Sequence, residues 1–493
     1  MKSFFNVRFI MSQKYIILCL SVIFMLSGCK TVGPNYSPPD MQTPAAWQKD
    51  VAGTSTGKQS EQEVLAKWWT TFNDPVLSGL MDRAVAGNLS LKQAINNVRQ
   101  ARIQRGISDA DRFPSVNATG SSGRSYSKDM MGDFTGTNNL SLGLDASWEL
   151  DIFGGVKRSL EASDAELQST QESYRDALIS LLAEVALDYI EVRSYQAQLK
   201  VAESNLKSQE ETYNITKWRY QAGLTTALDV EEANSSLEQT RSGIPSLKSS
   251  LEQAKSSIAV LLGKEPGALD VDLDEYKPVP VVPNEIALGI PADLLRRRPD
   301  LRKAERDLAA QTAKIGVAEA KRYPTITLSG NIGLSALGLG DLFSTDSLSA
   351  GATSGISWPV YKAGSIMKNI DLQWAVQEQK LITYQAALLT ALQDVEKALT
   401  AYSYDQIKRD SLLKASKSAE QAAEISREKY SSGLIDFQTV LSAERTQLSL
   451  QDSVAQSEAQ VISDIISLYK ALGGGWSSFE SDVENRSLSG DKQ

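Results

Sequence analysis

The chain repeats itself at a constant spacing of 210 residues, and this repetition constrains the fold more than any other feature of the sequence. The segment Arg112 to Val116 returns as Arg322 to Ile326. The other anchors with this spacing are Trp148 and Trp358, Gly154 and Gly364, Tyr220 and Tyr430, Gly223-Leu224 and Gly433-Leu434, and Leu262-Gly263 and Leu472-Gly473. Anchors at a single offset, without a gap, predict a structural unit that is present twice.

Each copy predicts the same order of elements: a helix, two strands, a very long helix, a turn and a returning helix. The opening helices are expected from about Pro75 to Arg112 and from about Pro291 to Arg322, because the following prolines prevent continuation. The chain is therefore divided into residues 1–28, a signal peptide; 29–74, a lipid-anchored segment; 75–263, the first copy; 264–290, a connecting segment; 291–473, the second copy; and 474–493, a tail.

Strands are indicated after each opening helix by apolar residues at every second position. The alternation is clear in Leu140–Leu150 and Ile326–Leu334, and weaker in Val116–Gly123 and Leu348–Trp358. Such a pattern is typical of a membrane barrel, and also of a half-buried sheet in a soluble protein. Four strands cannot close a membrane pore, since the smallest such barrels have about eight. A closed ring would have to be shared between subunits.

Two stretches without glycine or proline, 156–222 and 365–432, predict very long helices. Each would extend about 100 Å at about 1.5 Å per residue. Their apolar residues recur at alternating intervals of four and three, as in coiled coils. These residues are Leu178, Leu182, Val185, Tyr189 and Val192 in the first copy, and Leu388, Leu392, Val395, Leu399 and Tyr402 in the second. Gly223 and Gly433 end the helices, a returning helix follows each, and Pro245 is expected to bend the first of these.

The amino terminus predicts the compartment. Basic residues precede an apolar run from Tyr15 to Leu26, as in a secretion signal. This run of about 12 residues is too short to span about 30 Å of hydrocarbon as a helix. It ends in Leu26-Ser27-Gly28-Cys29, the pattern of a bacterial lipoprotein. We therefore expect Cys29 to be the first mature residue and to carry a covalent diacylglycerol and an N-acyl chain, which anchor the protein to a membrane.

The composition argues against several classes of function. The chain contains no histidine, and its second cysteine, Cys19, lies within the predicted signal peptide. The commonest general base, the commonest metal ligand and a thiol pair are thus missing. The formal charge of -9 includes no basic block, which argues against a nucleic-acid partner. We expect no enzymatic activity, no metal and no cofactor other than the acyl chains.

Several segments carry a resemblance to a known family. They are Val32-Gly33-Pro34-Asn35-Tyr36, Trp68-Trp69, Phe72-Asn73-Asp74-Pro75, Trp148 to Gly154, Leu295 to Arg302, Ala304-Glu305 and Ile315 to Ala318. In these segments the chain resembles the TolC-like outer membrane factors, in particular their lipoprotein (NodT) branch. The resemblance extends from Cys29 to about Trp476.

The resemblance implies a mostly helical protein with a small β part that assembles as a homotrimer. Three chains would each give four strands to a 12-stranded outer-membrane β-barrel, and their long antiparallel hairpins would form a periplasmic α-barrel. The implied location is the outer membrane, with a lipid anchor and a long periplasmic extension. The implied function is passive export of small molecules such as drugs or other toxic compounds, and the implied partners are outer-membrane lipid, a periplasmic adaptor and an inner-membrane pump.

By the same resemblance, the closed tip of the tunnel lies at the turns 223–233 and 433–443. The first turn offers Asp229, Glu231 and Glu232, which three-fold symmetry would turn into rings of carboxylates with raised pKa values. The second turn has fewer acids. Its candidates are Asp436, Gln438, Thr439 and Ser442. A solvated helix face is an equally good interpretation of each acidic residue.

Three alternatives remain open from the sequence. A structural coiled-coil lipoprotein could span the periplasm, but it has no use for two strand pairs. An outer-membrane conduit for type I protein secretion has the same architecture as an efflux channel. A periplasmic enzyme that relies on carboxylates is the third.

Overall fold

The computed structural model describes residues 31–48, 54–55, 64–128, 132, 134–280, 286–287 and 297–479. The predicted signal peptide, Cys29 and the end of the tail lie outside these residues. The chain divides into two compact units of three segments each. The first comprises Met1–Asp40, Arg99–Thr170 and Ala304–Tyr384, and the second comprises Met41–Val98, Gln171–Lys303 and Gln385–Gln493. Both copies of the repeat contribute to both units.

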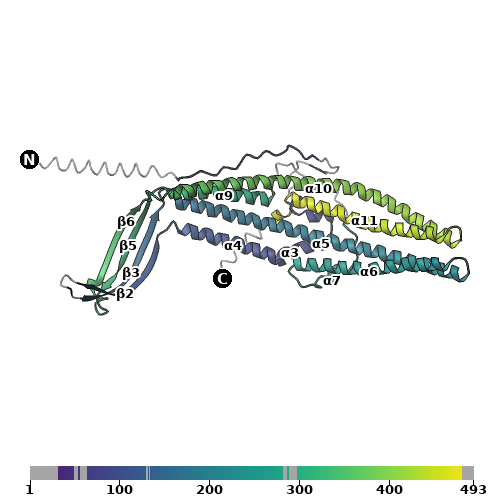
Figure 1. The fold of residues 1–493 in the computed structure, drawn as a ribbon, viewed down its shortest axis with the longest axis horizontal. Coiled ribbons are helices and arrows are strands. Elements are labelled where there is room, and N and C mark those ends of the chain that lie inside the picture. The colour runs from purple at the N-terminus through teal and green to yellow at the C-terminus, as the bar shows by residue number, and fades with distance from the viewer. Residues whose placement is uncertain are drawn as a thin grey trace, which may run out of the picture. The chain divides into compact units, whose positions relative to one another are not determined.

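From α4 and α9 onward, the order of elements is the same in the two copies (Figure 1). The first copy contains α3 (Pro75–Gly87), α4 (Leu89–Ala110), β2 (Ser115–Lys128), β3 (Phe134–Leu150), α5 (Gly155–Gln221) and α6 (Ala227–Leu261). The second contains α9 (Pro299–Ala320), β5 (Thr325–Ala336), β6 (Leu348–Ser357), α10 (Ser365–Ser431) and α11 (Phe437–Ala471). The short elements are β1 (Thr54–Ser55), η1 (Trp68–Phe72), α7 (Asp270–Leu273), β4 (Ile286–Ala287), η3 (Thr345–Ser347) and η4 (Trp476–Phe479). Helices α5 and α10 have 67 residues each, and α6 and α11 have 35 each, so the predicted duplication is confirmed.

The four long strands form one antiparallel sheet in the order β2-β3-β5-β6. Its register repeats between the copies, because Ser115 pairs with Ser147 and Thr325 pairs with Ser357. The two copies meet where β3 pairs with β5. Each strand pair is also fastened to the end of its opening helix by the same contact. The indole Nε1 of Trp148 donates to the Arg112 carbonyl, and that of Trp358 to the Arg322 carbonyl, both at 3.0 Å.

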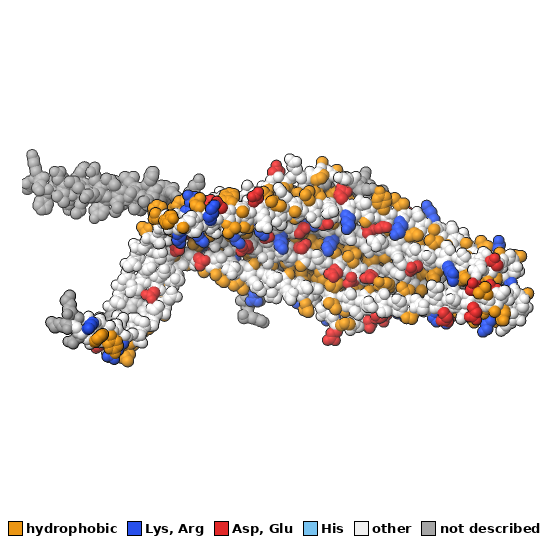
Figure 2. Space-filling view, viewed as in Figure 1, with side chains coloured by type: hydrophobic (Ala, Val, Ile, Leu, Met, Phe, Trp, Pro, Cys, Tyr) orange, Lys and Arg blue, Asp and Glu red, His pale blue; other side chains and the backbone are white. Residues whose placement is uncertain are grey.

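The sheet has one apolar and one polar face, because successive side chains of a strand point to opposite sides. Leu144 pairs with Ile332 on the apolar face, where the two side chains are 49% and 54% exposed in the single chain. On the other face, the Thr119 hydroxyl donates to Asp145 at 2.6 Å, and the Ser121 and Ser141 hydroxyls lie 2.8 Å apart. The face of the sheet seen in Figure 2 carries few charged side chains. The four predicted strands are confirmed as β2, β3, β5 and β6.

The long helices bury the residues that the four-three spacing identified. Leu182, Val185 and Val192 of α5 are completely buried, as are Val395 and Leu399 of α10. Among the predicted residues, Leu392 is only half-buried. Ion pairs such as Arg241–Glu210, at 2.9 Å, join α6 to α5 outside the buried contact between the helices. The predicted helical hairpins are therefore present, with α5 beside α6 and α10 beside α11 (Figure 1).

The prediction of one opening helix from Pro75 to Arg112 is wrong, because the helix breaks at Asn88. The Asn88 side chain accepts from the Leu91 amide in the first turn of α4, and it donates to the Leu261 carbonyl at the end of α6. Gly87 allows this approach, since a Cβ atom there would lie 2.1 Å from the Leu262 carbonyl oxygen. A partner distant in the sequence therefore decides where the helix ends.

The predicted start of the second opening helix, at about Pro291, lies outside the described residues and stays a prediction. Helix α9 starts at Pro299, where the missing amide of proline causes no loss, and residues 291–296 lie outside the described part of the chain. Helix α6 continues through Pro245, and its predicted bend stays a prediction. None of the helices in the described residues carries an apolar run long enough to cross a membrane.

Candidate functional site: the turns of the two helical hairpins

The two hairpins turn at glycines in the left-handed conformation. Gly223 has φ 72° and Gly433 has φ 75°, values that side chains with a Cβ atom rarely adopt. In each turn the amide after the glycine donates back to the last turn of the long helix: Leu224 to the Arg219 carbonyl at 2.8 Å, and Leu434 to the Lys429 carbonyl at 2.9 Å. The two turn glycines predicted from sequence thus have equivalent geometry.

The returning helices begin with caps in which an acid and a hydroxyl have exchanged places. In α6, Thr226 is the N-cap and Asp229 completes a capping box. At the equivalent positions of α11, Asp436 is the N-cap, and Thr439 donates to it through its amide at 2.9 Å and its hydroxyl at 2.6 Å. Both caps satisfy amides that the first helical turn leaves without partners.

This role affects the charge of both acids. Although partial burial works to raise the pKa of Asp229, hydrogen bonds from Thr225 and Thr226 lower it below its usual range. Hydrogen bonds from Thr439 likewise lower the pKa of Asp436. Both carboxylates are therefore ionised at neutral pH in the single chain. The rise in pKa expected for a three-fold carboxylate ring stays a prediction.

Direct contacts join the two turns to each other. The Arg219 guanidinium donates to the Tyr430 carbonyl at 2.9 Å and to the Ser431 carbonyl at 3.3 Å, and lies 4.8 Å from the centre of the Tyr430 ring. The Gln438 amide donates to Glu232, so the structure brings these two predicted residues together. The first hairpin thereby holds the end of the second long helix.

An apolar cluster lies beneath these contacts. Tyr430 and Phe437 pack edge to face with ring centres 5.8 Å apart, and Val440, Leu441 and Ala233 complete the cluster. All five side chains are buried. The contacts between the turns are therefore supported by a packed core.

A buried acid follows further along α11. Glu444 is 4% exposed and accepts from the Thr212 hydroxyl at 2.6 Å and from Arg427 at 3.4 Å. Burial raises the pKa of Glu444 above its usual range, although the hydrogen bonds from Thr212 and Arg427 act in the opposite direction. The Asn205 amide of α5 also donates to Gln451 of α11, at 2.7 Å. Polar side chains thus cross-link α5 and α11 as well as the turns.

The remaining predicted residues lie on the surface of the returning helices. Glu231 of α6 is exposed, and so are Thr439 and Ser442 of α11. No group of three or more histidine, cysteine, aspartate or glutamate residues in the described part of the chain could hold a metal ion.

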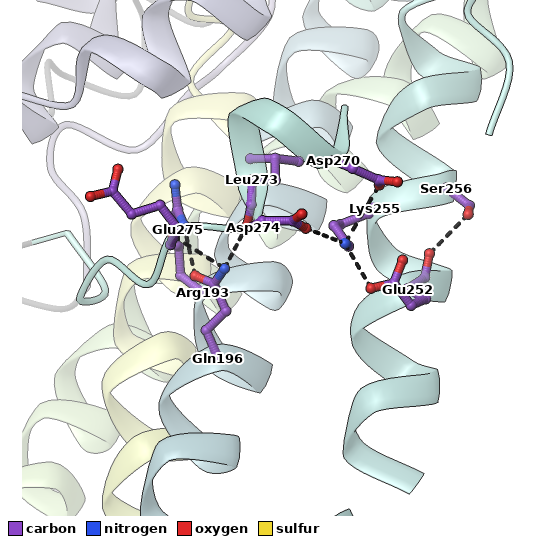
Figure 3. A network of polar contacts seen from close by, with 9 residues as sticks. All are labelled: Arg193, Gln196, Glu252, Lys255, Ser256, Asp270, Leu273, Asp274 and Glu275. Carbon is purple, nitrogen blue, oxygen red and sulfur yellow. Dashed lines mark hydrogen bonds and ion pairs between the residues drawn. The ribbon is translucent and has the colours of Figure 1, made fainter. Parts of the chain in front are cut away.

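The other end of the first hairpin is fixed by a second polar network (Figure 3). The Lys255 side chain is 5% exposed and lies 2.7 Å from Glu252 and 2.8 Å from Asp274. From α5, Arg193 donates to the Glu275 carbonyl at 2.9 Å and Gln196 donates to the Leu273 carbonyl at 2.6 Å. This network ties the segment after α6 back onto the hairpin, which makes it a structural support.

Sequence reasoning missed Arg219 and Glu444. One signal was present in the sequence: beside the repeated Tyr220 and Tyr430, Arg219 has Lys429 as its equivalent, and lysine lacks the planar fork of arginine. Glu444 interrupts a buried helix face, and no pattern in the sequence indicates that Thr212 is its partner.

The chain is similar to known proteins over most of its length. The sequence profile described as "Outer membrane efflux protein" matches residues 80–264 and, a second time, residues 290–474. Nodulation protein T of Rhizobium leguminosarum bv. trifolii is 33% identical over 454 residues, which cover 92% of this chain and 96% of that protein. "Probable outer membrane lipoprotein SilC" of Salmonella typhimurium is 30% identical over 463 residues, which cover 93% of this chain and 98% of that protein. A solved structure of the outer-membrane channel OprN is similar with a TM-score of 0.85 and 35% identity, over 91% of this chain and 100% of that one.

Proposed function

This chain belongs to the outer membrane efflux protein family, and on this premise we propose that three copies of it form the passive outer-membrane conduit of an efflux system. The profile covers both copies of the repeat, and the relatives are matched over almost their whole length. The cargo that we propose is small molecules, such as drugs or other toxic compounds.

One observation carries this proposal: the sheet has an apolar face, and each of its two outer strands has one edge without a partner strand. Among the described residues β2 pairs only with β3, and β6 only with β5. An open sheet edge is not tolerated in a bilayer, where each unpaired backbone group costs several kcal/mol. Three copies that join β2 to β6 remove every edge and give a 12-stranded barrel, with the apolar face toward lipid.

The turns of the hairpins supply the closed end of the conduit in this proposal. Arg219, Glu232 and Gln438 hold the two hairpins of one chain together. A passive conduit needs such a barrier when no pump is attached. The adaptor and the inner-membrane pump are the partners that would release it, and we place the adaptor contact at the turns.

Lipid attachment at Cys29 is the second part of the proposal. The sequence Leu26-Ser27-Gly28-Cys29 and the similarity to a protein described as an outer membrane lipoprotein support it. Radiolabelled palmitate should therefore label the wild-type protein and fail to label the Cys29→Ala variant. Label that persists in the variant would contradict the assignment.

Conductance tests the main proposal. Purified protein in planar lipid bilayers should give discrete steps of current, and removal of the protein from cells should increase their susceptibility to exported compounds. A structural lipoprotein that only spans the periplasm gives no pores, so a silent bilayer that contains inserted protein would favour that alternative.

A further inference from the structure

The first described residues of the chain are bound at the junction between β3 and α5. The Val32 amide donates to the Phe153 carbonyl at 3.1 Å. Thr31 lies against Gly154, where a Cβ atom would be 2.6 Å from the threonine methyl group. Gly33 touches the backbone of Gly316 in α9, since a Cβ atom at Gly33 would lie 2.4 Å from the Gly316 Cα. Glycines on both sides thus allow backbone contact.

A buried arginine completes this contact. Arg158 is 4% exposed and donates to the Val32 carbonyl at 3.0 Å, the Gly33 carbonyl at 3.1 Å and the Asn35 side-chain oxygen at 2.8 Å. Its third nitrogen, Nη1, donates to Glu161 at 2.6 Å. A planar fork with fixed donors suits this set of acceptors, and a lysine cannot reach all of them at once.

The positions related to this site by the 210-residue repeat lack the contact. Lys368, the equivalent of Arg158, has a side chain that is 84% exposed and pairs only with Asp371, the equivalent of Glu161, among the described residues. A Cβ atom at Gly364 or Gly106, the equivalents of Gly154 and Gly316, would meet no atom within 4 Å. The duplication therefore provides an internal control: α5 and α9 bind the amino-terminal segment, and the equivalent residues of α10 and α4 do not.

We propose that residues 31–36 and Arg158 form a clasp that holds the acylated amino terminus beside the sheet. Cys29 precedes Thr31 by two residues, which span at most about 7 Å, so the clasp restricts where the acyl chains can enter the bilayer. Strand β3 ends at Leu150, just before the clasp. The proposal rests on the lipid attachment proposed above, and it adds a fixed position for the anchor.

A fixed anchor differs from a free tether in its effect on insertion. A lipid on a flexible segment explores a large volume, whereas a lipid held at the base of the sheet keeps the strands close to the membrane surface at high effective concentration. The clasp would thus couple lipid attachment to insertion of the sheet.

Hydrogen exchange tests the clasp without reference to the lipid. In the full chain, Arg158→Lys gives the first copy the residue of the second, and Lys368→Arg is the matched control. A peptide that covers residues 31–36 should exchange at least about tenfold faster in Arg158→Lys, as expected for loss of hydrogen bonds to a charged group, and at the wild-type rate in Lys368→Arg. Equal rates in the three proteins would overturn the clasp.

Cross-linking tests the position of the anchor. Cells fed a palmitate analogue with a photoreactive diazirine should yield wild-type and Lys368→Arg protein whose acyl chain cross-links to the lower part of β3 and its neighbours. In Arg158→Lys these products should fall several-fold while total incorporation is unchanged. Cross-links that are the same in Arg158→Lys overturn the proposal, and a wild-type protein that takes up no analogue refutes the lipid attachment instead.

Discussion

At the scale of single residues, the contacts between the two hairpin turns depend on side chains that the two copies do not share. Arg219 reaches the carbonyls at the end of α10, whereas its equivalent, Lys429, has no planar fork with which to return the contact. The guanidinium contact is therefore made from the first hairpin only, and the second hairpin contributes the hydrogen bond from Gln438 to Glu232. A single substitution can weaken the connection without affecting the hairpins themselves.

Arg219→Ala should increase the conductance of the reconstituted channel several-fold, because it removes two charge-assisted hydrogen bonds that hold the turns together. Lys429→Ala is the matched control. The measurement is single-channel current in planar bilayers, and we expect the control to remain at the wild-type level. Equal currents from both variants would show that Arg219 does not restrain the turns.

Asp188 of α5 predicts a dependence of stability on pH. Burial, together with the charges of Glu184 and Glu191, raises the pKa of Asp188 to about 6. The folded protein therefore holds this proton more tightly than the unfolded chain, whose aspartates titrate near pH 4. Its contribution to stability is present below about pH 4 and is lost as the pH rises through about 6.

Asp188→Asn should remove the loss of stability that occurs when the Asp188 carboxyl ionises. The unfolding midpoint of the variant, measured by circular dichroism in detergent, should exceed that of the wild type by about 1–3 °C at pH 7.5 and should decline less between pH 4.5 and 7.5. The exposed Asp111→Asn controls for the removal of a charge. A variant that keeps the wild-type pH dependence would exclude Asp188 as its source.

At the scale of elements, the returning helices show how two sequences can form one cap. Thr226 with Asp229 begins α6, and Asp436 with Thr439 begins α11, so the carboxylate and the hydroxyl have exchanged positions. In both cases an oxygen accepts from the amide three residues on. The start of each returning helix thus needs one carboxylate and one hydroxyl at these two positions, and either order provides the capping hydrogen bonds.

The double exchange Thr226→Asp with Asp229→Thr should therefore leave the start of α6 stable. Thr226→Ala alone should cost about 1 kcal/mol, as is usual for a lost N-cap. Hydrogen exchange of the peptide that covers 224–233 would measure both effects. Faster exchange in the double variant than in Thr226→Ala would contradict the idea that the two orders are equivalent.

At the scale of the whole molecule, the sheet is amphipathic, and among the described residues each outer strand lacks a partner along its outer edge. The proposed trimer turns the face that contains Leu144 toward lipid and the face that contains Ser141 toward the lumen. Insertion of the assembly therefore depends on which face carries a charge.

Leu144→Lys should reduce the amount of assembled protein in the outer membrane, since a lysine on a lipid face costs about 2–4 kcal/mol near the middle of the bilayer. Ser141→Lys, on the opposite face of the same strand, should be tolerated. Immunoblots of outer-membrane fractions without heating, which preserve trimers, would compare the two. If both variants assemble to the same level, the assignment of faces is wrong.

Local patterns predicted the helices and strands, because strand alternation, the four-three spacing and the turn glycines are each features of a short segment of the chain. They did not predict the break at Asn88, which depends on a carbonyl of Leu261. They also missed the partners of Arg219, because these lie in the other copy. What escaped prediction is in each case a contact between residues that are far apart in the sequence.

A duplicated chain faces an ambiguity that an unduplicated one does not, because any segment outside the repeat has two equivalent places to bind. Divergence between the two places, which includes Arg158 and Lys368, removes this degeneracy for the leading segment. The segment binds where a guanidinium is available and not where an ammonium takes its place. Mispaired conformers, with the leader on the wrong half, are thus disfavoured from the moment the two halves come together.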